Sequence, residues 1–316
     1  MVRVSTQAGL RVVVLAGGDS PERPVSLASG EQVARALAET GHRVVRFDPS
    51  VTEIEAIPWH AYDACFLALH GGAGEDGRVQ ERLAALGVPF TGSSARASRL
   101  AMCKSASKER FFQVGVPTQP YVLLHESDSA ADITGKTASL RYPVVVKPDS
   151  QGSSLGLGVA HTVDELQQAA RAALAIDPFA IVEPYILGRE FTVALLGRQP
   201  LPLVEIITPG GLFDFEAKYE SAMTDYGFDV GLLPDTVAEI EQTAIGAAEA
   251  LGTAGLVRVD VILDRRARPW VLEVNTIPGM TTHSLAPKAA DRVGLSLLAL
   301  CEWMLEDCLV ASEVNG

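Results

Sequence analysis

Two short segments near the end of the chain carry the side chains best suited to chemistry. Arg258-Val-Asp260 and Glu273-Val-Asn275 alternate polar with apolar residues. In a β-strand this alternation places the two polar residues of each segment on one face. If the two strands are neighbours, two carboxylates and an amide oxygen gather beside a guanidinium. Such oxygen ligands suit Mg²⁺ that also coordinates nucleotide phosphates. The alternative is a solvent-facing strand surface with ordinary charges.

Two loops could bring small molecules to these strands. The polar, glycine-containing loop 276–285 follows the second strand directly, where a substrate would meet the metal. Upstream, Lys147 leaves an apolar strand and is followed by the glycine- and serine-rich segment 151–156. Small residues let backbone N–H groups approach an anion closely, so this segment predicts a loop that covers phosphates. A plain hairpin turn is the alternative, and the segment does not match the Walker pattern.

Two further candidates lie at the ends of apolar strands. His70 leads into the glycine-rich loop 71–77, and Glu22 follows the pair Gly17-Gly18. Open α/β sheets bind ligands outside the carboxyl ends of their strands, so both side chains are candidates for substrate contact. A structural histidine and an acid that only favours a helix N-terminus are the alternatives. The glycines lack the Gly-x-Gly-x-x-Gly spacing, which disfavours a nicotinamide dehydrogenase.

The elements that must position these residues form three groups. Apolar strands alternate with helical patterns over residues 1–98, which predicts an α/β domain with a parallel sheet and a helix over 25–39. Residues 99–187 predict a smaller α+β lobe with helices over 100–114 and 163–175. Residues 188–316 predict a third lobe with an antiparallel sheet and a helix over 235–251, which holds the two polar strands.

Composition and charge restrict the class of protein. The 316 residues are 47% hydrophobic and 21% charged, as in folded globular proteins, and the formal net charge is -13. This charge repels nucleic acid and anionic lipid, and no apolar run approaches the roughly 20 residues of a membrane helix. The four cysteines are scattered without a Cys-x-x-Cys pair, as expected for reduced thiols. We therefore expect a cytoplasmic protein that binds neither nucleic acid nor membranes.

Taken in order, these segments resemble the D-alanine–D-alanine ligase family of the ATP-grasp superfamily over nearly the entire chain. The matching segments are GGDSPERPVSL, ALHGGAGEDGRVQ, PFTGSS with AMCK, VVVKPDSQGSSLG, GREFTVALLG, FEAKY, RVDVIL and LEVNTIPGMTTHSL. The resemblance implies a three-lobed ATP-grasp fold, in which the N-terminal domain binds the first D-alanine. It also implies ligation of two D-alanines to D-alanyl-D-alanine through a D-alanyl phosphate, for peptidoglycan precursor synthesis, by a homodimer.

The resemblance also assigns a nucleotide site and a metal site between the second and third lobes. The residues that it assigns to ATP are Lys104, Lys147 and Lys218 at the phosphates, Glu183, Tyr185 and Ile186 at the adenine, and Glu190 at the ribose. It assigns two Mg²⁺ ions, with Mn²⁺ as an alternative, to Asp260, Glu273 and Asn275. These ions would neutralise charge as the first D-alanine attacks the γ-phosphorus.

The two amino acids have their own residues in the family. The residues assigned to the first D-alanine are Glu22 at its ammonium, Ser153 and Tyr219 orienting Glu22, and His70 nearby. Those assigned to the oxyanion are Arg258 and the backbone N–H of Gly279, and those at the carboxylate of the second D-alanine are Ser284 and the backbone of Leu285. Lys218 and Tyr219 lie on a loop expected to close and exclude water.

Three positions depart from the pattern of the family. Cys103 stands where an Asp usually precedes the lysine, Gln151 replaces a common Glu, and Pro184 replaces a Lys beside the adenine. These changes bear on nucleotide affinity and turnover more than on reaction class. Two alternatives remain: a ligase with a different second D-amino acid or a D-hydroxy acid, and a catalytically silent nucleotide-binding homologue. Tyr219 favours the dipeptide product, and the intact polar strands count against a silent homologue.

Overall fold

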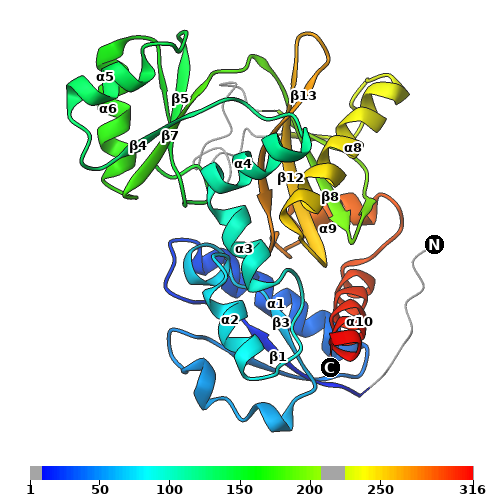
Figure 1. Ribbon diagram of the computed structural model, residues 1–316. Coiled ribbons are helices and arrows are strands. Elements are labelled where there is room, and N and C mark those ends of the chain that lie inside the picture. The colour runs from blue at the N-terminus through cyan, green and yellow to red at the C-terminus, as the bar shows by residue number, and fades with distance from the viewer. Residues whose placement is uncertain (1–8, 208–224, 316) are drawn as a thin grey trace.

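The residues that the structure describes form three β-sheets with helices packed against them (Figure 1). The computed structural model describes residues 9–207 and 225–315. The first sheet is parallel and the other two are antiparallel. The predicted combination of an α/β domain with α+β lobes is therefore confirmed, whereas the division at residues 98 and 187 stays a prediction.

The first sheet is short, and its strands run in the order β2-β1-β3. Its elements are β1 (Arg11–Leu15), α1 (Arg23–Glu39), β2 (Arg43–Phe47), η1 (Ile54–Ala56), η2 (Trp59–Ala61), β3 (Ala64–Leu67), η3 (Gly72–Gly74) and α2 (Arg78–Ala85). β1 and β3 are apolar and almost fully buried, as expected for parallel strands covered on both faces. Glu22 and His70 follow β1 and β3, so both candidates lie at the carboxyl edge of this sheet.

The second sheet has the strand order β4-β7-β5-β6. Its elements are β4 (Val122–His125), α5 (Ala130–Thr137), β5 (Val144–Pro148), β6 (Gly158–Ala160), α6 (Val163–Leu174) and β7 (Phe179–Pro184). Apolar side chains of α5 and α6 share one core with the strands, and Figure 1 shows both helices on the outer side of the sheet. The opposite side faces the third sheet.

The third sheet carries the two polar strands, in the order β11-β10-β8-β12-β13, with β9 pairing to β8. Its elements are β8 (Gly188–Leu196), β9 (Gln199–Pro200), β10 (Val204–Ile207), β11 (Asp225–Gly227), α8 (Pro234–Leu251), β12 (Leu256–Asp264), β13 (Pro269–Asn275) and α9 (Leu285–Asp291). α8 covers one face, with Phe111 from the preceding lobe in the same core. The short strand β11 pairs with β10 in antiparallel orientation at the edge of this sheet.

The single helix expected over 100–114 is wrong, because the structure has two helices there. They are α3 (Ala95–Met102) and α4 (Lys104–Val114), and Cys103 between them is extended. Asp149 explains the break. Its carboxylate accepts hydrogen bonds from the backbone N–H (2.7 Å) and the hydroxyl (2.7 Å) of Ser105, and its backbone oxygen accepts from the N–H of Lys104. These bonds satisfy donors of a new helix N-terminus, which a continuous helix would have used internally.

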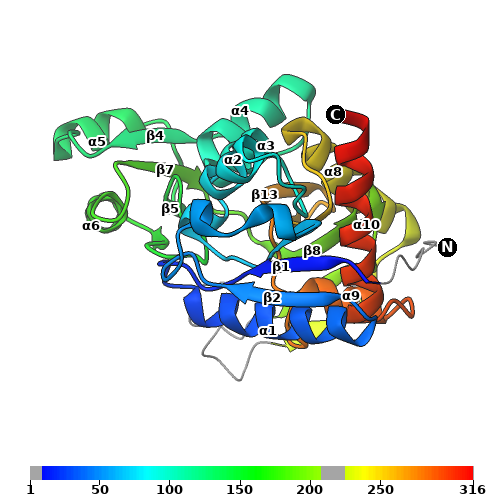
Figure 2. The same cartoon turned by 90° about the horizontal axis from the view of Figure 1, so that it is seen from below.

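The last helix, α10 (Leu297–Asn315), packs back against the first sheet. Apolar residues of α10, among them Leu300, Met304 and Leu305, share a core with α1, β1 and β3, and Figures 1 and 2 both place α10 beside that lobe. His42 and Glu302 form a buried contact across this junction, at 2.9 Å. None of the described helices combines the length and the apolar composition needed to cross a bilayer.

Candidate functional site

Two cavities meet where the three sheets approach one another. The first, about 510 Å³, lies between the carboxyl edge of the first sheet and strands β12 and β13. The second, about 300 Å³, lies between the second and third sheets. Lys104, Gln151 and Glu273 line both cavities. A molecule in one cavity would therefore share side chains with a molecule in the other.

All the site residues predicted from the sequence that the structure describes line these cavities. In the first are Glu22, His70, Lys104, Ser153, Arg258, Glu273, Asn275, Gly279, Ser284 and Leu285. In the second are Lys104, Lys147, Glu183, Tyr185, Ile186, Glu190, Asp260 and Glu273. Lys218 and Tyr219 lie outside the described residues. Residues as far apart in the sequence as Glu22 and Leu285 are thus brought to one place.

The two polar strands pair as antiparallel neighbours, as predicted. Arg258 lies opposite Asn275, and Asp260 lies opposite Glu273. The guanidinium of Arg258 donates two hydrogen bonds to the carboxylate of Asp260, both at 2.9 Å. The Thr192 hydroxyl on β8 donates a third at 2.7 Å. Asp260 is almost fully buried, so the interpretation of a solvent-facing charged strand does not hold.

This group offers oxygen ligands to a cation, although the carboxylate of Asp260 is already held by Arg258. Asp260 and Glu273 line the second cavity together, and the amide oxygen of Asn275 accepts from the N–H of Ile277 at 3.0 Å. No group of three His, Cys, Asp or Glu side chains at metal-binding distance occurs in the described part of the chain. Carboxylate and amide oxygens on adjacent strands still fit a hard divalent ion that takes its other ligands from phosphate and water.

Glu22 is held between the glycine-serine turn and the loop after β3. The Ser153 hydroxyl donates a short hydrogen bond to its carboxylate. Gly71 lies against the same carboxylate, since a Cβ on Gly71 would be 2.5 Å from Glu22 Oε2. A side chain at position 71 would push this carboxylate aside, and Gly71 also has the positive φ of 65° that glycine adopts readily. The carboxylate is therefore fixed from two sides, which suits it to position a cationic group.

His70 joins the first lobe to the loop after β13. Its Nδ1 lies 3.0 Å from the backbone oxygen of Ile277, and its Nε2 lies 3.0 Å from the hydroxyl of Ser29. A carbonyl oxygen only accepts, so Nδ1 carries the proton and Nε2 accepts from Ser29. Both ring nitrogens have protein partners, and His70 is buried. His70 thus links the first lobe to the loop after β13, and part of the residue also lines the first cavity.

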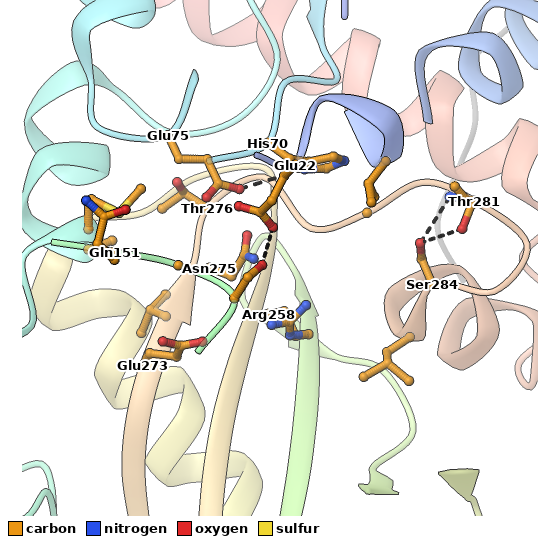
Figure 3. A pocket seen from close by; sticks show the side chains of 18 of the residues that line it. Glu22, His70, Glu75, Gln151, Arg258, Glu273, Asn275, Thr276, Thr281 and Ser284 are labelled. Carbon is orange, nitrogen blue, oxygen red and sulfur yellow. Dashed lines mark hydrogen bonds and ion pairs between the residues drawn. The ribbon is translucent and has the colours of Figure 1, made fainter. Parts of the chain in front are cut away.

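The loop after β13 forms the other end of the first cavity. Ser284 precedes α9, and its hydroxyl oxygen accepts from the backbone N–H of Thr281 at 3.1 Å and lies 2.9 Å from the Thr281 hydroxyl. Gly279 passes so close that a Cβ would be 2.6 Å from the Ser284 oxygen. Figure 3 shows Ser284 and Thr281 across the cavity from Gln151, with Arg258 and Asn275 between them. Arg258 therefore lies between the two ends of the first cavity.

Buried lysines surround Glu183 in the second cavity. Lys147 Nζ lies 2.7 Å from Glu183 Oε2, and Lys108 pairs with Oε1 at still shorter range. Burial alone would raise the pKa of Glu183, but the two ammonium groups outweigh burial and hold that pKa below its usual value. Burial lowers the pKa of Lys108 to about 8. Glu183 is therefore a carboxylate, which accepts hydrogen bonds and does not donate them.

Lys104 connects the two cavities. Its ammonium donates a hydrogen bond of 2.6 Å to the backbone oxygen of Gln151 and lies 3.7 Å from Glu273 Oε2. One of the backbone groups expected to contact adenine is already used. The N–H of Tyr185 donates to the backbone oxygen of Pro143 at 3.0 Å. This leaves the carbonyl of Tyr185 and the N–H of Ile186 for a nucleobase.

The sequence analysis missed several residues that line the cavities or support them. Glu75, Lys108, Gln119 and Tyr226 were given no role. Glu75 is buried five positions after His70, in the same glycine-rich loop, and burial raises its pKa, so its position in that loop was a usable signal. Lys108 lies one helical turn after Lys104. No pattern in the sequence pointed to Gln119 or Tyr226.

Comparison with known proteins agrees with this geometry. A family profile described as "D-ala D-ala ligase C-terminus" matches residues 111–306. The chain is 40% identical to a D-alanine–D-alanine ligase from Gloeobacter violaceus, over 95% of this chain and 100% of that protein. It is 41% identical to one from Bordetella avium, over 96% of both chains.

Solved structures give the same result. The crystal structure of D-alanine–D-alanine ligase from Bacillus anthracis complexed with ATP is similar with a TM-score of 0.85, at 29% identity, over 98% of this chain and 100% of that one. A second structure of the Bacillus anthracis enzyme gives a TM-score of 0.86 at 30% identity, with the same coverage. Since the identity extends over nearly the whole length of its relatives, the chain belongs to the D-alanine–D-alanine ligase family.

Proposed function

We propose that this protein joins two molecules of D-alanine to D-alanyl-D-alanine with ATP, through a D-alanyl phosphate, and so supplies a peptidoglycan precursor. The observation that carries the proposal is the pair of adjoining cavities that share Lys104, Gln151 and Glu273. A nucleotide in the second cavity would direct its terminal phosphate at an amino acid in the first. That arrangement is what transfer of a phosphoryl group to a carboxylate requires.

The nucleotide would lie against β5, β7, β12 and β13. Lys104 and Lys147 would contact the phosphates, and Glu190 would contact the ribose. The adenine would lie by Glu183 and the backbone of Tyr185 and Ile186. Lysine ammonium groups offset phosphate charge without fixing its orientation, so the backbone of the glycine-serine turn would supply the directed contacts. Family membership and the ATP complex of the Bacillus anthracis enzyme support the use of ATP.

We also propose that Asp260, Glu273 and Asn275 hold Mg²⁺, in two ions, with Mn²⁺ as an alternative. When bound, the ions would neutralise charge on the phosphates during transfer. Asp260 is buried and paired with Arg258 in the described structure, so binding would require the guanidinium to share this carboxylate or to release it. Arg258 already lines the first cavity, so a released guanidinium would remain on the substrate side.

The first D-alanine would place its ammonium on Glu22, whose orientation Ser153 fixes, with His70 nearby. Its carboxylate would attack the γ-phosphorus and release ADP. The amine of the second D-alanine, in its neutral form, would then attack the acyl carbon, and collapse of the tetrahedral intermediate would break the C–O bond and release inorganic phosphate. Arg258 and the Gly279 N–H would stabilise the oxyanion that forms.

Ser284 and the Leu285 backbone would hold the carboxylate of the second D-alanine. Lys218 and Tyr219, outside the described residues, are proposed to close over the site and exclude water from the acyl phosphate. The protein is further proposed to be a cytoplasmic homodimer.

The test supplies ATP, Mg²⁺ and D-alanine and follows ADP release together with dipeptide formation. Both should depend on D-alanine, and L-alanine should be inactive. Ligation of D-lactate in preference to D-alanine would move the assignment to a depsipeptide ligase, and no ADP release would indicate a silent homologue. Glu273→Gln should lower Mg²⁺-dependent turnover by at least 100-fold, a range typical of groups that stabilise transferred charge. The exposed Glu249→Gln on α8 is the matched control and should leave turnover unchanged.

A further inference from the structure

Gln119 has a buried amide in the wall of the second cavity. It lies between α4 and β4, is 3% exposed, and lines this cavity with Glu183. Its side-chain oxygen accepts no hydrogen bond from any part of the chain that the structure describes. A buried amide oxygen without a donor destabilises a protein by roughly 1 to 3 kcal/mol, and such groups are few in native proteins. The position of this one suggests a ligand that brings the donor.

Lys108 holds Gln119 next to Glu183. Its ammonium pairs with Glu183 Oε1 and donates to the Thr118 hydroxyl at 2.7 Å and to the Gln119 backbone oxygen at 3.2 Å. The Thr118 hydroxyl donates in turn to the Val271 backbone oxygen on β13 at 2.9 Å. All these groups are buried, so segment 118–119 has one fixed position. One ammonium thus holds both the Glu183 carboxylate and the Gln119 backbone, and both residues line the second cavity.

The surroundings suit a flat ring with an amino group on its edge. Val145, Leu157, Ile262 and Leu272 line the same cavity and give it apolar walls. Glu183 offers only acceptors, and Gln119 offers a free acceptor in its oxygen. The 6-amino group of adenine has two hydrogens, one for each acceptor. The 6-oxo group of guanine or hypoxanthine would instead face the Glu183 carboxylate and lose that contact.

We propose that Gln119 is a nucleobase-recognition residue, whose side-chain oxygen accepts one hydrogen of the adenine 6-amino group while Glu183 accepts the other. The inference rests on the proposed function only in that the second cavity takes ATP. It requires no statement about the amino acids. It makes Gln119 a determinant of the preference for ATP over purine nucleotides without the amino group.

The experiment measures nucleotide binding without D-alanine, by displacement of a fluorescent ATP analogue. It uses ATP and purine riboside triphosphate, which lacks the 6-amino group, on the full chain, Gln119→Leu, and Gln113→Leu. Gln113 is an exposed residue of α4 and is the control for the substitution. Gln119→Leu should weaken ATP binding roughly three- to tenfold, the range of one hydrogen bond. Binding of purine riboside triphosphate should change less than twofold.

Equal weakening of both nucleotides would assign Gln119 a packing role and overturn the inference. Thermal melting gives a second test, because leucine has nearly the same size and removes an unpaired amide. The nucleotide-free Gln119→Leu protein should melt at the same temperature as the parent or higher, and a drop of more than about 5 °C would show that the amide has a structural partner. If Gln119→Leu ligates D-alanine normally and the ratio of its affinities for the two nucleotides is unchanged, this inference is refuted but the proposed function is not. Absence of ATP binding refutes the proposed function as well.

Discussion

Replacement of Gly71 by alanine tests whether the close contact with Glu22 controls the first amino-acid site. The new Cβ would lie 2.5 Å from Glu22 Oε2, where ordinary contact begins near 3.4 Å, so the carboxylate must move by about 0.9 Å. That shift would disrupt the hydrogen bond from Ser153. A hydrogen bond to a charged group contributes about 1.5 to 3 kcal/mol, which corresponds to roughly 10- to 150-fold in kcat/KM. Misplacement by about 1 Å has effects of similar size in other active sites.

Gly87→Ala is a matched control for the backbone. Gly71 and Gly87 have nearly the same φ, 65° and 68°, but nothing lies within 4 Å of a Cβ on Gly87. Both variants should lose unfolding free energy because of the positive φ, and Gly71→Ala should lose more, since Gly71 combines its φ with a ψ of 170°, a region that only glycine adopts readily. Only Gly71→Ala should lose kcat/KM for the first D-alanine, measured from ADP release at saturating ATP. If the two variants have the same kcat/KM within twofold, the contact with Glu22 has no part in substrate positioning.

Two further predictions concern buried charge. The pKa of Lys108 is lowered to about 8 from 10.5, so the folded protein binds fewer protons than the unfolded chain between these pH values. The unfolding free energy of the parent, measured in urea relative to that of Lys108→Met, should therefore rise by about 1 to 3 kcal/mol from pH 8 to 10.5. A difference between the two proteins that does not change with pH would contradict this prediction. Cys103→Asp would place a second carboxylate where the thiol now donates to Asp149 at 3.1 Å. Because the two carboxylates repel each other, the Cys103→Asp protein should be less stable than the Cys103→Ser protein by about 1 kcal/mol at pH 7, and this difference in stability should disappear below pH 4. Equal stability of the two variants at pH 7 would contradict the repulsion.

The parts of the site carried by local patterns were predictable from the sequence. Alternation in two strands predicted that their polar side chains would gather if the strands were neighbours. The strands do pair, with Asp260 opposite Glu273. Glycines after the strands predicted where Glu22 and His70 would lie. These signals depend on residues close together in the chain, whose geometry follows from strand and turn conformation.

Features that depend on distant contacts were not predictable. The break at Cys103 is made by Asp149, 46 positions away, and helix propensity alone favours a continuous helix. The pairing of Lys108 with Glu183 spans 75 positions, and a lysine in a helix usually faces solvent. Gln119 has no local signature, because its environment is formed by elements from three parts of the fold. Such contacts appear only once the sheets are assembled.

The packing of α10 on the first sheet has a consequence for how the protein acquires its structure. Strands near the beginning of the chain receive part of their apolar cover from Leu300, Met304 and Leu305. The amino-terminal segment therefore cannot complete its core as it leaves the ribosome and must wait until the residues of α10 have been made. This long-range dependence raises contact order, which slows folding, and we expect α10 and the first sheet to unfold together because they share one core.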